Sequence, residues 1–282
     1  MSMGASRYRI PGRLEGTVLG RIVSAKMHEI AGSKHKWGTE SIRMALDRAP
    51  EIRPLRRALL GRPPAIIAEL KKASPSAGLI CPSFDPESLA TQYQDAGAAA
   101  ISVVTEAQFF QGNLEFLARL RWTTRIPLLR KDFIVDPYQI HEARHAGADA
   151  VLLIAALHDL PSLKHLCLEA GNLGMDTLVE VHDEVELERS LAAGATLVGV
   201  NNRNLENFEV SLETGLRLGR RIPNGVVAVA ESGIHSAEDV RMLADAGFHA
   251  FLVGESLLRS SDPGAALSSL IAACTFANGK VR

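Results

Sequence analysis

The chain has 282 residues, of which 46% are apolar and 22% charged, and its formal charge is −1 at neutral pH. These proportions are typical of a globular protein and exclude a disordered or low-complexity chain. The balanced charge offers no basic surface for nucleic acid, and no apolar run reaches the ~20 residues that span a bilayer, so we expect neither partner.

The three cysteines, Cys81, Cys167 and Cys274, are far apart and have no C-x-x-C spacing. Such scattered cysteines argue against a disulfide framework and fit a reducing compartment. The first residues contain no apolar signal segment, so we predict a cytoplasmic protein. We assign no metal, because the nine histidines form neither H-x-H nor H-E-x-x-H. The i, i+4 pair His141 and His145 is interpreted as a surface or interface feature.

Residues 1–64 carry helical patterns and no strand pattern. Apolar residues recur with helical spacing over 18–30, around Ile42, and again over 55–60. Because about 60 residues make a weak core alone, we predict that this segment is a helical extension packed on a main domain at 65–282.

From residue 65 onward, short apolar runs alternate with amphipathic stretches. The runs are 65–70, 99–104, 126–130, 149–155, 177–181, 196–200, 226–230 and 249–253. Nearly continuous apolar strands are typical of a parallel sheet that helices cover on both faces. Asp85, Asp183 and Ser236 stand where helix N-caps are expected, and Pro86 follows the first of them.

An Ala-Gly pair closes every second predicted helix, at Gly97, Gly147, Gly194 and Gly247. Glycine at this place supplies the left-handed residue that ends a helix. Eight strands alternating with helices favour an α/β fold of the (β/α)8 TIM barrel type, with the N-terminal helical extension beside it. The alternative is a doubly wound open sheet. A G-x-G-x-x-G motif after the first strand would favour that fold, and the sequence lacks this motif.

Polar groups follow the runs at the carboxyl ends of the strands, where such barrels carry their active sites. Seven of the eight runs end in them: Glu69, Lys71 and Ser74; Thr105 and Glu106; Lys131 and Asp132; Glu180 and His182; Asn201 and Arg203; Glu231 and Ser232; and Glu255. We expect both lysines to lie near Glu69 and Glu180, where burial and opposite charges compete in setting the pKa values. Such a cluster can supply a general acid and a general base, whereas any single pair can also be a structural filling of the barrel.

The last two strands are followed by Ser232-Gly233 and Gly254-Glu255, which can offer free backbone N–H groups to a phosphate. Ser74 can close this site from the first loop. Phe110, after the second strand, is either a packed hinge residue or part of an aromatic wall for a flat substrate.

At these residues the sequence resembles the indole-3-glycerol phosphate synthase family, whose members are (β/α)8 barrels with an N-terminal helical extension. The matching segments are IIAELKKASPSAGLI, TEAQFFQG, LLRKDFIVDPYQI, LVEVHDEVEL, VGVNNRNL, VAESGI and LVGESLLR, between about residues 63 and 270. The resemblance implies ring closure of 1-(2-carboxyphenylamino)-1-deoxyribulose 5-phosphate with loss of CO2 and water, in tryptophan biosynthesis. It also implies a small sugar phosphate as partner, no cofactor, and a monomer or weak homodimer.

The resemblance further implies roles for individual residues. Lys131 matches the general acid, Glu180 the general base, Lys71 the lysine that meets the substrate carboxylate, Glu69 the carboxylate that holds the lysines, and Asn201 an amide that contacts substrate. The implied substrate-binding residues are Ser74, Phe110, Phe133, Arg203, Glu231, Ser232, Gly233, Gly254 and Glu255.

Two other functions remain open from the sequence. One is a related phosphate-binding barrel enzyme such as phosphoribosylanthranilate isomerase, which uses a Cys/Asp acid–base pair, although Cys81 lies well past the first strand. The other is a non-enzymatic relative that keeps only the phosphate site. Such a protein is expected to lose Lys131 or Glu180, and both are present.

Overall fold

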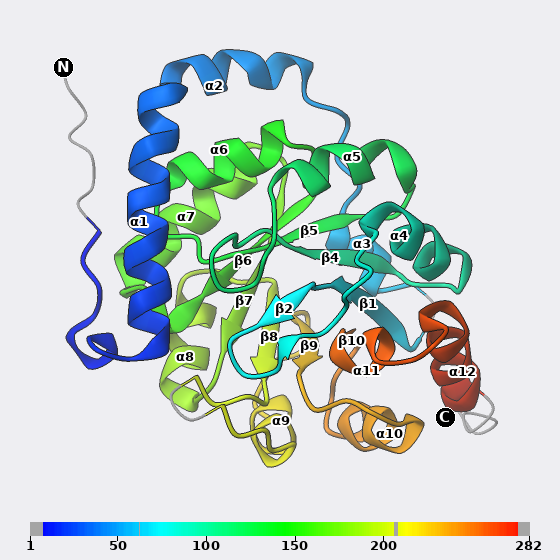
Figure 1. Cartoon of the computed structure of the whole chain (residues 1–282). Helices are drawn as coiled ribbons and strands as arrows, with labels where there is room; N and C mark the ends of the chain where they lie inside the picture. The colour runs from blue at the N-terminus through cyan, green and yellow to red at the C-terminus, as the bar shows by residue number, and fades with distance from the viewer. Residues whose placement is uncertain (1–7, 62, 206–207, 276–282) are drawn as a thin grey trace.

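The computed structural model describes residues 8–61, 63–205 and 208–275, and its centre is a closed barrel of eight parallel strands (Figure 1). The strands are β1 (Ala65–Leu70), β4 (Ala100–Val104), β5 (Leu128–Lys131), β6 (Ala150–Ile154), β7 (Asp176–Val181), β8 (Leu197–Asn201), β9 (Val227–Glu231) and β10 (Ala250–Val253). Each pairs with its neighbour in the sequence, and β10 closes on β1 with Ala250 beside Ala65. The predicted barrel is confirmed and the open sheet is excluded.

Helices surround the barrel and follow the predicted signals. They are α4 (Pro86–Asp95), α5 (Glu115–Thr123), α6 (Pro137–His145), α7 (Leu160–Asn172), α8 (Glu184–Ala192), α9 (Glu213–Gly219), α10 (Ala237–Asp245), α11 (Glu255–Leu258) and α12 (Pro263–Thr275). The side chains of Asp85, Asp183 and Ser236 accept backbone N–H groups at the starts of α4, α8 and α10, as predicted. The four Ala-Gly glycines have φ between +90° and +104°, which confirms their helix-ending role.

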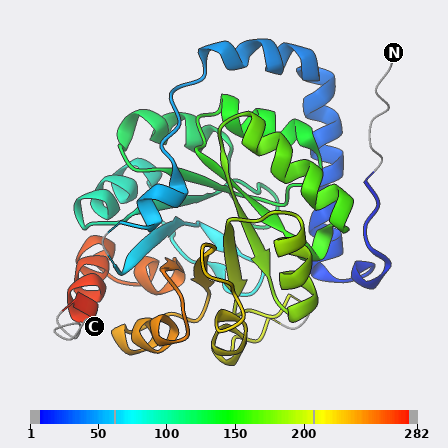
Figure 2. The same cartoon turned by 180° about the vertical axis from the view of Figure 1, so that it is seen from behind.

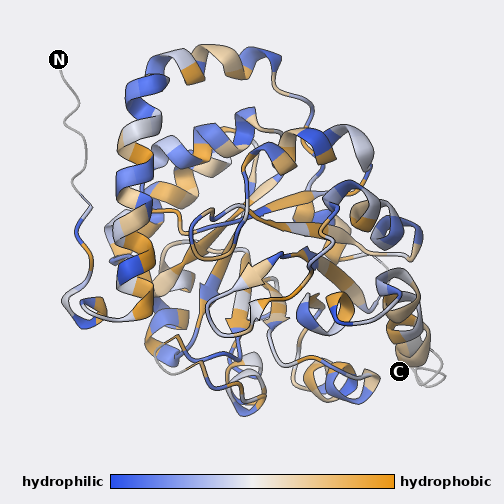
Figure 3. Cartoon of the chain, viewed as in Figure 1, coloured by the Kyte–Doolittle hydropathy of each residue, from blue (hydrophilic) through white to orange (hydrophobic). Residues whose placement is uncertain are grey.

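Strand alternation divides the core into two clusters. Residues such as Ile66 and Val179 point outward and pack under the helices. Residues such as Ile67 and Leu178 point inward, and their cluster also contains Leu19, Ile42, Leu55 and Leu59 of the extension. The strands are largely in the apolar colour in Figure 3, in agreement with a core on both sides of them. The extension therefore shares its core with the barrel interior.

The described part of the extension contains three α-helices, α1 (Val18–Lys36), α2 (Thr39–Ala45) and α3 (Leu55–Leu59), in agreement with the three predicted ones, and two short 3-10 helices at Gly12–Leu14 and Leu46–Arg48. The first is longer than its apolar pattern, because Lys34 in its polar last part is held by Asp136 of the barrel at 2.6 Å. Figures 1 and 2 show α1 along one side of the barrel and α3 on the opposite face from the β2–β3 hairpin (Ala73–Ser74 and Gly78–Leu79). Residues 1–7 and 62 of the predicted extension, and 206–207 and 276–282 of the predicted barrel domain, lie outside the described residues.

Buried ionic contacts add to this packing. Lys26 of α1 is 1% exposed and lies 3.1 Å from Asp132, directly after β5. Of the two expected positions, surface or interface, His141 has the second: it is 3% exposed and contacts Glu169 of α7 at 2.6 Å. His145 is exposed, as expected.

Within the described part of the chain, no helix is long and apolar enough to cross a membrane.

Candidate active site

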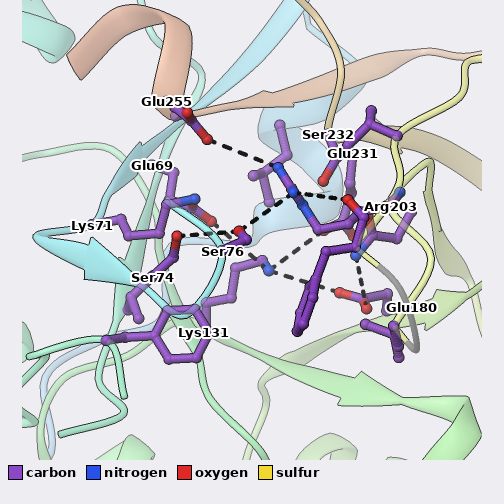
Figure 4. Close-up of a pocket in the computed structure, with 18 of the residues that line it drawn as sticks. Glu69, Lys71, Ser74, Ser76, Lys131, Glu180, Arg203, Glu231, Ser232 and Glu255 are labelled. Atoms are coloured by element: carbon purple, nitrogen blue, oxygen red, sulfur yellow. Dashed lines mark hydrogen bonds and ion pairs between the residues drawn. The ribbon is translucent and has the colours of Figure 1, made fainter. Parts of the chain in front are cut away.

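A cavity of about 330 Å³ opens at the carboxyl ends of the strands, which is within the size range of small-molecule sites (Figure 4). The structure brings all fourteen of the sequence-predicted site residues to its walls. They are Glu69, Lys71, Ser74, Phe110, Lys131, Phe133, Glu180, Asn201, Arg203, Glu231, Ser232, Gly233, Gly254 and Glu255. Residues separated by as many as 186 positions in the sequence therefore share one site because the barrel closes.

Four charged side chains form one complete layer of the barrel. Glu69, Lys131, Glu180 and Glu231 come from β1, β5, β7 and β9, the first, third, fifth and seventh strands around it. Alternate strands of such a barrel contribute four side chains to each layer. The residues two positions earlier, Ile67, Leu129, Leu178 and Val229, belong to the apolar core beneath. The charged layer thus rests on a water-free floor.

Lys131 occupies the centre of this layer. Its Nζ lies 3.7 Å from Oε2 of Glu180 and 3.8 Å from Oε2 of both Glu69 and Glu231. The second lysine, Lys71, pairs with Oε1 of Glu69 at 2.6 Å. The predicted proximity of both lysines to Glu69, and of Lys131 to Glu180, agrees with these distances. Three carboxyl groups therefore surround one ammonium.

The surroundings set these groups apart in acidity. Burial opposes the charge on Lys131, but Glu180, Glu69 and Glu231 outweigh it and raise the pKa of the ammonium. Burial likewise opposes ionisation of Glu180, yet Lys131, His182 and Asn201 together lower its pKa to about 2. At neutral pH the site holds a protonated lysine beside an ionised Glu180.

Glu231 differs from its two neighbours. Burial, reinforced by the charges on Glu180 and Glu69, raises its pKa to about 8 despite Lys131. Neither carboxyl oxygen has a hydrogen-bond partner among the described residues, and the residue is 1% exposed. Gly199 of β8 makes the space for it, since a Cβ there would clash with Oε1 of Glu231. The sequence placed Glu231 at the rim but did not reveal a neutral acid, because that state depends on charges from three other strands.

The opposite side of the cavity is suited to a phosphate. Ser232 and Gly233 have φ of +63° and +76°, and Gly254 is the N-cap of α11. For serine this conformation is strained and is a feature of functional loops. The Ser74 hydroxyl accepts the N–H of Ala77 at 3.2 Å, which fixes the first loop at the same end.

Arg203 spans the mouth of the cavity. Its Nη1 lies 3.4 Å from the hydroxyl of Ser76 and its Nη2 lies 3.8 Å from Oε2 of Glu255 (Figure 4). It therefore connects the loops that follow β1, β8 and β10, on the phosphate side of the site.

An apolar wall completes the cavity. The rings of Phe110 and Phe133 lie 5.9 Å apart at 41° and pack on each other, so together they present one aromatic surface to the cavity. Val18, Leu19 and Ile22 of α1 line the cavity beside them. The sequence allowed the first 40 residues to cover the mouth of the barrel but identified no site residue among them, because the same apolar face of α1 is explained equally well by packing on the barrel.

The cysteine of the isomerase alternative does not belong to this geometry. Cys81 packs against the outer core cluster, and its backbone N–H donates to the carbonyl of Lys72 at 3.1 Å. In the described ranges, no three His, Cys, Asp or Glu side chains are grouped so that they could hold a metal ion.

A family model described as indole-3-glycerol phosphate synthase matches residues 19–270. The chain belongs to the indole-3-glycerol phosphate synthase family. A relative with that name from Chromobacterium violaceum is 48% identical over 258 residues, covering 90% of this chain and 97% of the relative. One from Koribacter versatilis is 56% identical over 208 residues, covering 73% and 80%. The resemblance found in the sequence is confirmed.

More distant solved structures share the barrel alone. A 3-hexulose-6-phosphate synthase aligns with a TM-score of 0.59 at 16% identity, covering 74% of this chain and 99% of that one. Thiamine phosphate pyrophosphorylase from Pyrococcus furiosus aligns with a TM-score of 0.60 at 17% identity, covering 80% and 100%. The family assignment therefore rests on the sequence matches, and these structures support the fold.

Proposed function

We propose that the cavity binds 1-(2-carboxyphenylamino)-1-deoxyribulose 5-phosphate and forms indole-3-glycerol phosphate with Lys131 as general acid and Glu180 as general base. The chain is a carboxy-lyase of tryptophan biosynthesis, as its family membership indicates. The observation that carries the residue assignment is the charged layer, in which one ammonium faces three carboxyl groups at 3.7–3.8 Å.

The two ends of the cavity match the two anionic ends of the substrate. Backbone N–H groups near Gly233 and Gly254 receive the phosphate, with Ser74 and Arg203 beside them. The substrate carboxylate lies by Lys71, and the aromatic ring lies between Phe110 and the apolar face of α1. This orientation directs the sugar carbonyl toward Lys131.

Ring closure is the first chemical step. The ring carbon that bears the carboxylate attacks the sugar carbonyl, and the electron pair of the C=O bond moves to oxygen. Lys131 donates its proton to that oxygen as the charge develops. The ammonium also stabilises the developing alkoxide through its charge, and the apolar layer beneath strengthens this interaction.

Loss of CO2 follows from the cation that ring closure produces. The bond to the carboxylate breaks, and its electrons return to the ring, which regains aromaticity. The cyclised cation itself accepts these electrons, so the step needs no further electron sink from the chain.

Dehydration completes the reaction. The new hydroxyl leaves as water with a proton from Lys71, and Glu180 removes a proton from the adjacent CH2 group. A pKa near 2 makes Glu180 a weak base in the resting site. Because Lys131 has by then given up its charge, the main opposing charge is gone and the basicity of Glu180 rises. The order of the steps thus follows from electrostatics, and the balance is one proton taken up per CO2 released.

Incubation of the purified chain with this sugar phosphate tests the proposal. We expect indole fluorescence and CO2 to appear in equal amounts. Indole fluorescence without CO2, or no reaction at all, would contradict it. Cytoplasmic location, and a monomer or weak homodimer, remain further proposals, and sedimentation of the purified chain measures the second.

A further inference from the structure

His182 lies directly behind Glu180, between two buried carboxylates. Its Nε2 is 3.2 Å from Oε1 of Glu180, and its Nδ1 is 3.0 Å from Oε2 of Glu186. The imidazole is 15% exposed, and the two glutamates are 2% and 4% exposed. Glu180 lines the substrate cavity whereas His182 does not, and the mechanism above does not use the imidazole.

Glu186 is itself held in place by groups from two directions. Its Oε2 also accepts the backbone N–H of His182 at 2.9 Å, and its Oε1 lies 3.3 Å from Nη2 of Arg13. Arg13 belongs to a short turn before α1 and also donates to the carbonyl of Ala156 at 3.1 Å. A continuous ionic relay, Arg13–Glu186–His182–Glu180, therefore runs from the extension to the base.

This relay leaves the two oxygens of Glu180 in different situations. His182 and the amide of Asn201, at 3.1 Å, both hold Oε1. Oε2 instead faces Lys131 and the cavity at 3.7 Å. Only Oε2 is therefore free to accept a proton from a substrate.

We propose that His182 is a positioning residue, which fixes Glu180 so that Oε2 faces the substrate, and that Glu186 and Arg13 hold His182 in that role. The proposal rests on the function of Glu180 as the base. Through Arg13, the turn before α1 therefore helps to position the base, although Arg13 itself does not line the cavity.

The charge on His182 supports this role. Burial opposes its protonation, but hydrogen bonds and charges from Glu180 and Glu186 outweigh burial and raise its pKa to about 10. Charged groups from several elements surround the ring. They are Glu180 of β7, Glu231 of β9, Asp183 at the N-cap of α8, Glu186 in the first turn of α8, and Arg13 before α1. At neutral pH the ring is an imidazolium, whose Nδ1 donates to Glu186 and whose Nε2 faces Oε1 of Glu180 as an ion pair.

The test compares His182→Ala with His182→Gln and with His141→Ala. The last variant is the matched control. His141 also pairs with a largely buried glutamate, Glu169, but this pair lies between α6 and α7 and not at the active site. We expect His182→Ala to lower kcat about 10- to 100-fold, the usual cost of a misplaced catalytic group, with KM changed less than about twofold. His182→Gln restores a donor to Oε1 and should recover most of kcat. His141→Ala should keep the wild-type kcat.

The pH profile separates positioning from loss of fold. Loss of the imidazolium raises the pKa of Glu180, so the acidic limb of kcat in His182→Gln should move up by roughly one pH unit. If His182→Ala does not fold, the ¹⁵N shifts of His182 in the wild-type chain provide the test, and we expect a doubly protonated ring at pH 8. A neutral ring at pH 7, or wild-type kcat and pH profile in a folded His182→Ala, would overturn the proposal. A wild-type chain that does not turn over the sugar phosphate would instead overturn the proposed function.

Discussion

Lys131 combines two properties that seldom occur together, a raised pKa and a position that is mostly removed from solvent. The raised pKa means that Lys131 gives its proton to water only weakly. The alkoxide formed in ring closure is, however, a much stronger base than the carboxylates of Glu180 and Glu69 that hold the proton in the resting site. The ammonium can therefore remain charged in the resting site and still deliver its proton in the transition state. Lys131 therefore contributes to catalysis in two distinct ways, through its positive charge and through the proton that it donates.

Substitution of Lys131 distinguishes these contributions. Lys131→Ala should lower kcat by at least ~10²-fold, the usual scale for a positioned acid. Lys131→Arg keeps a cation but holds its proton too firmly to donate it, so it should be nearly as slow. Stopped assays of indole fluorescence measure both variants. An arginine variant close to wild type would show that the charge alone suffices.

Ser232 lies at the other end of the site, in the loop that we propose to bind the phosphate. Its φ of +63° places its backbone in the phosphate loop, and Val210 and Leu212 crowd the adjacent Gly233. Ser232→Phe should raise KM more than it lowers kcat, because the phosphate is remote from the bonds that change. Ser232→Gly, which adopts the same φ without strain, should stay close to wild type. If kcat of the phenylalanine variant falls by as large a factor as its KM rises, a purely binding role is contradicted.

At the scale of elements, the sequence predicted all eight barrel strands and all three helices of the extension. It did so because the apolar runs, the caps such as Asp183 and the Ala-Gly helix ends are local signals. The rim residues could also be found, since the carboxyl end of every strand points to one side of a barrel. The states of Glu231 and His182 could not, because they depend on charges that only the closed barrel brings together.

The extension shares a core with the barrel, and its unfolding should therefore coincide with that of the barrel. The chain has two tryptophans, Trp37 at the end of α1 and Trp122 on α5. In Trp122→Phe the remaining Trp37, which packs on His145 of α6 at 4.9 Å, reports the contact between the extension and the barrel. Urea unfolding followed by its fluorescence and by far-UV circular dichroism should give the same midpoint. An earlier midpoint for Trp37 would show that the predicted boundary near residue 64 separates two independent units.

For the whole molecule, the shifted groups predict how stability depends on pH. His158 has its pKa lowered to about 4, first by burial, so its contribution is complete above pH 6.5 and is lost as the pH falls to 4. His182 and Glu231, with pKa values raised to about 10 and 8, bind protons in the folded chain that the unfolded chain releases. Their contribution therefore declines as the pH rises.

The sum of these three groups and Glu180 gives a definite profile. As the pH is lowered from about 6.5 to 4.5, His158 decreases the free energy of unfolding and Glu231 increases it by a similar amount, so the two effects cancel. From pH 6.5 to 8, the free energy of unfolding should fall by roughly 2–4 kcal/mol, at about 1.4 kcal/mol per pH unit for each group. Below pH 4.5 it should fall again, as Glu180 and His158 take up protons on unfolding. Urea titrations across pH 4–8 measure the profile, and a rise from pH 6.5 to 8 would be incompatible with the charged layer described.

The most direct measurement is a crystal structure of the chain with a reduced, non-cyclising analogue of the sugar phosphate. The account predicts phosphate density against the backbone of Gly233 and Gly254, the analogue carboxylate beside Lys71, and the reduced carbonyl oxygen within about 3 Å of the Lys131 ammonium, as proton transfer requires. A ligand bound in the reverse direction, with phosphate on the two lysines and Lys131 out of reach of the carbonyl oxygen, would contradict it.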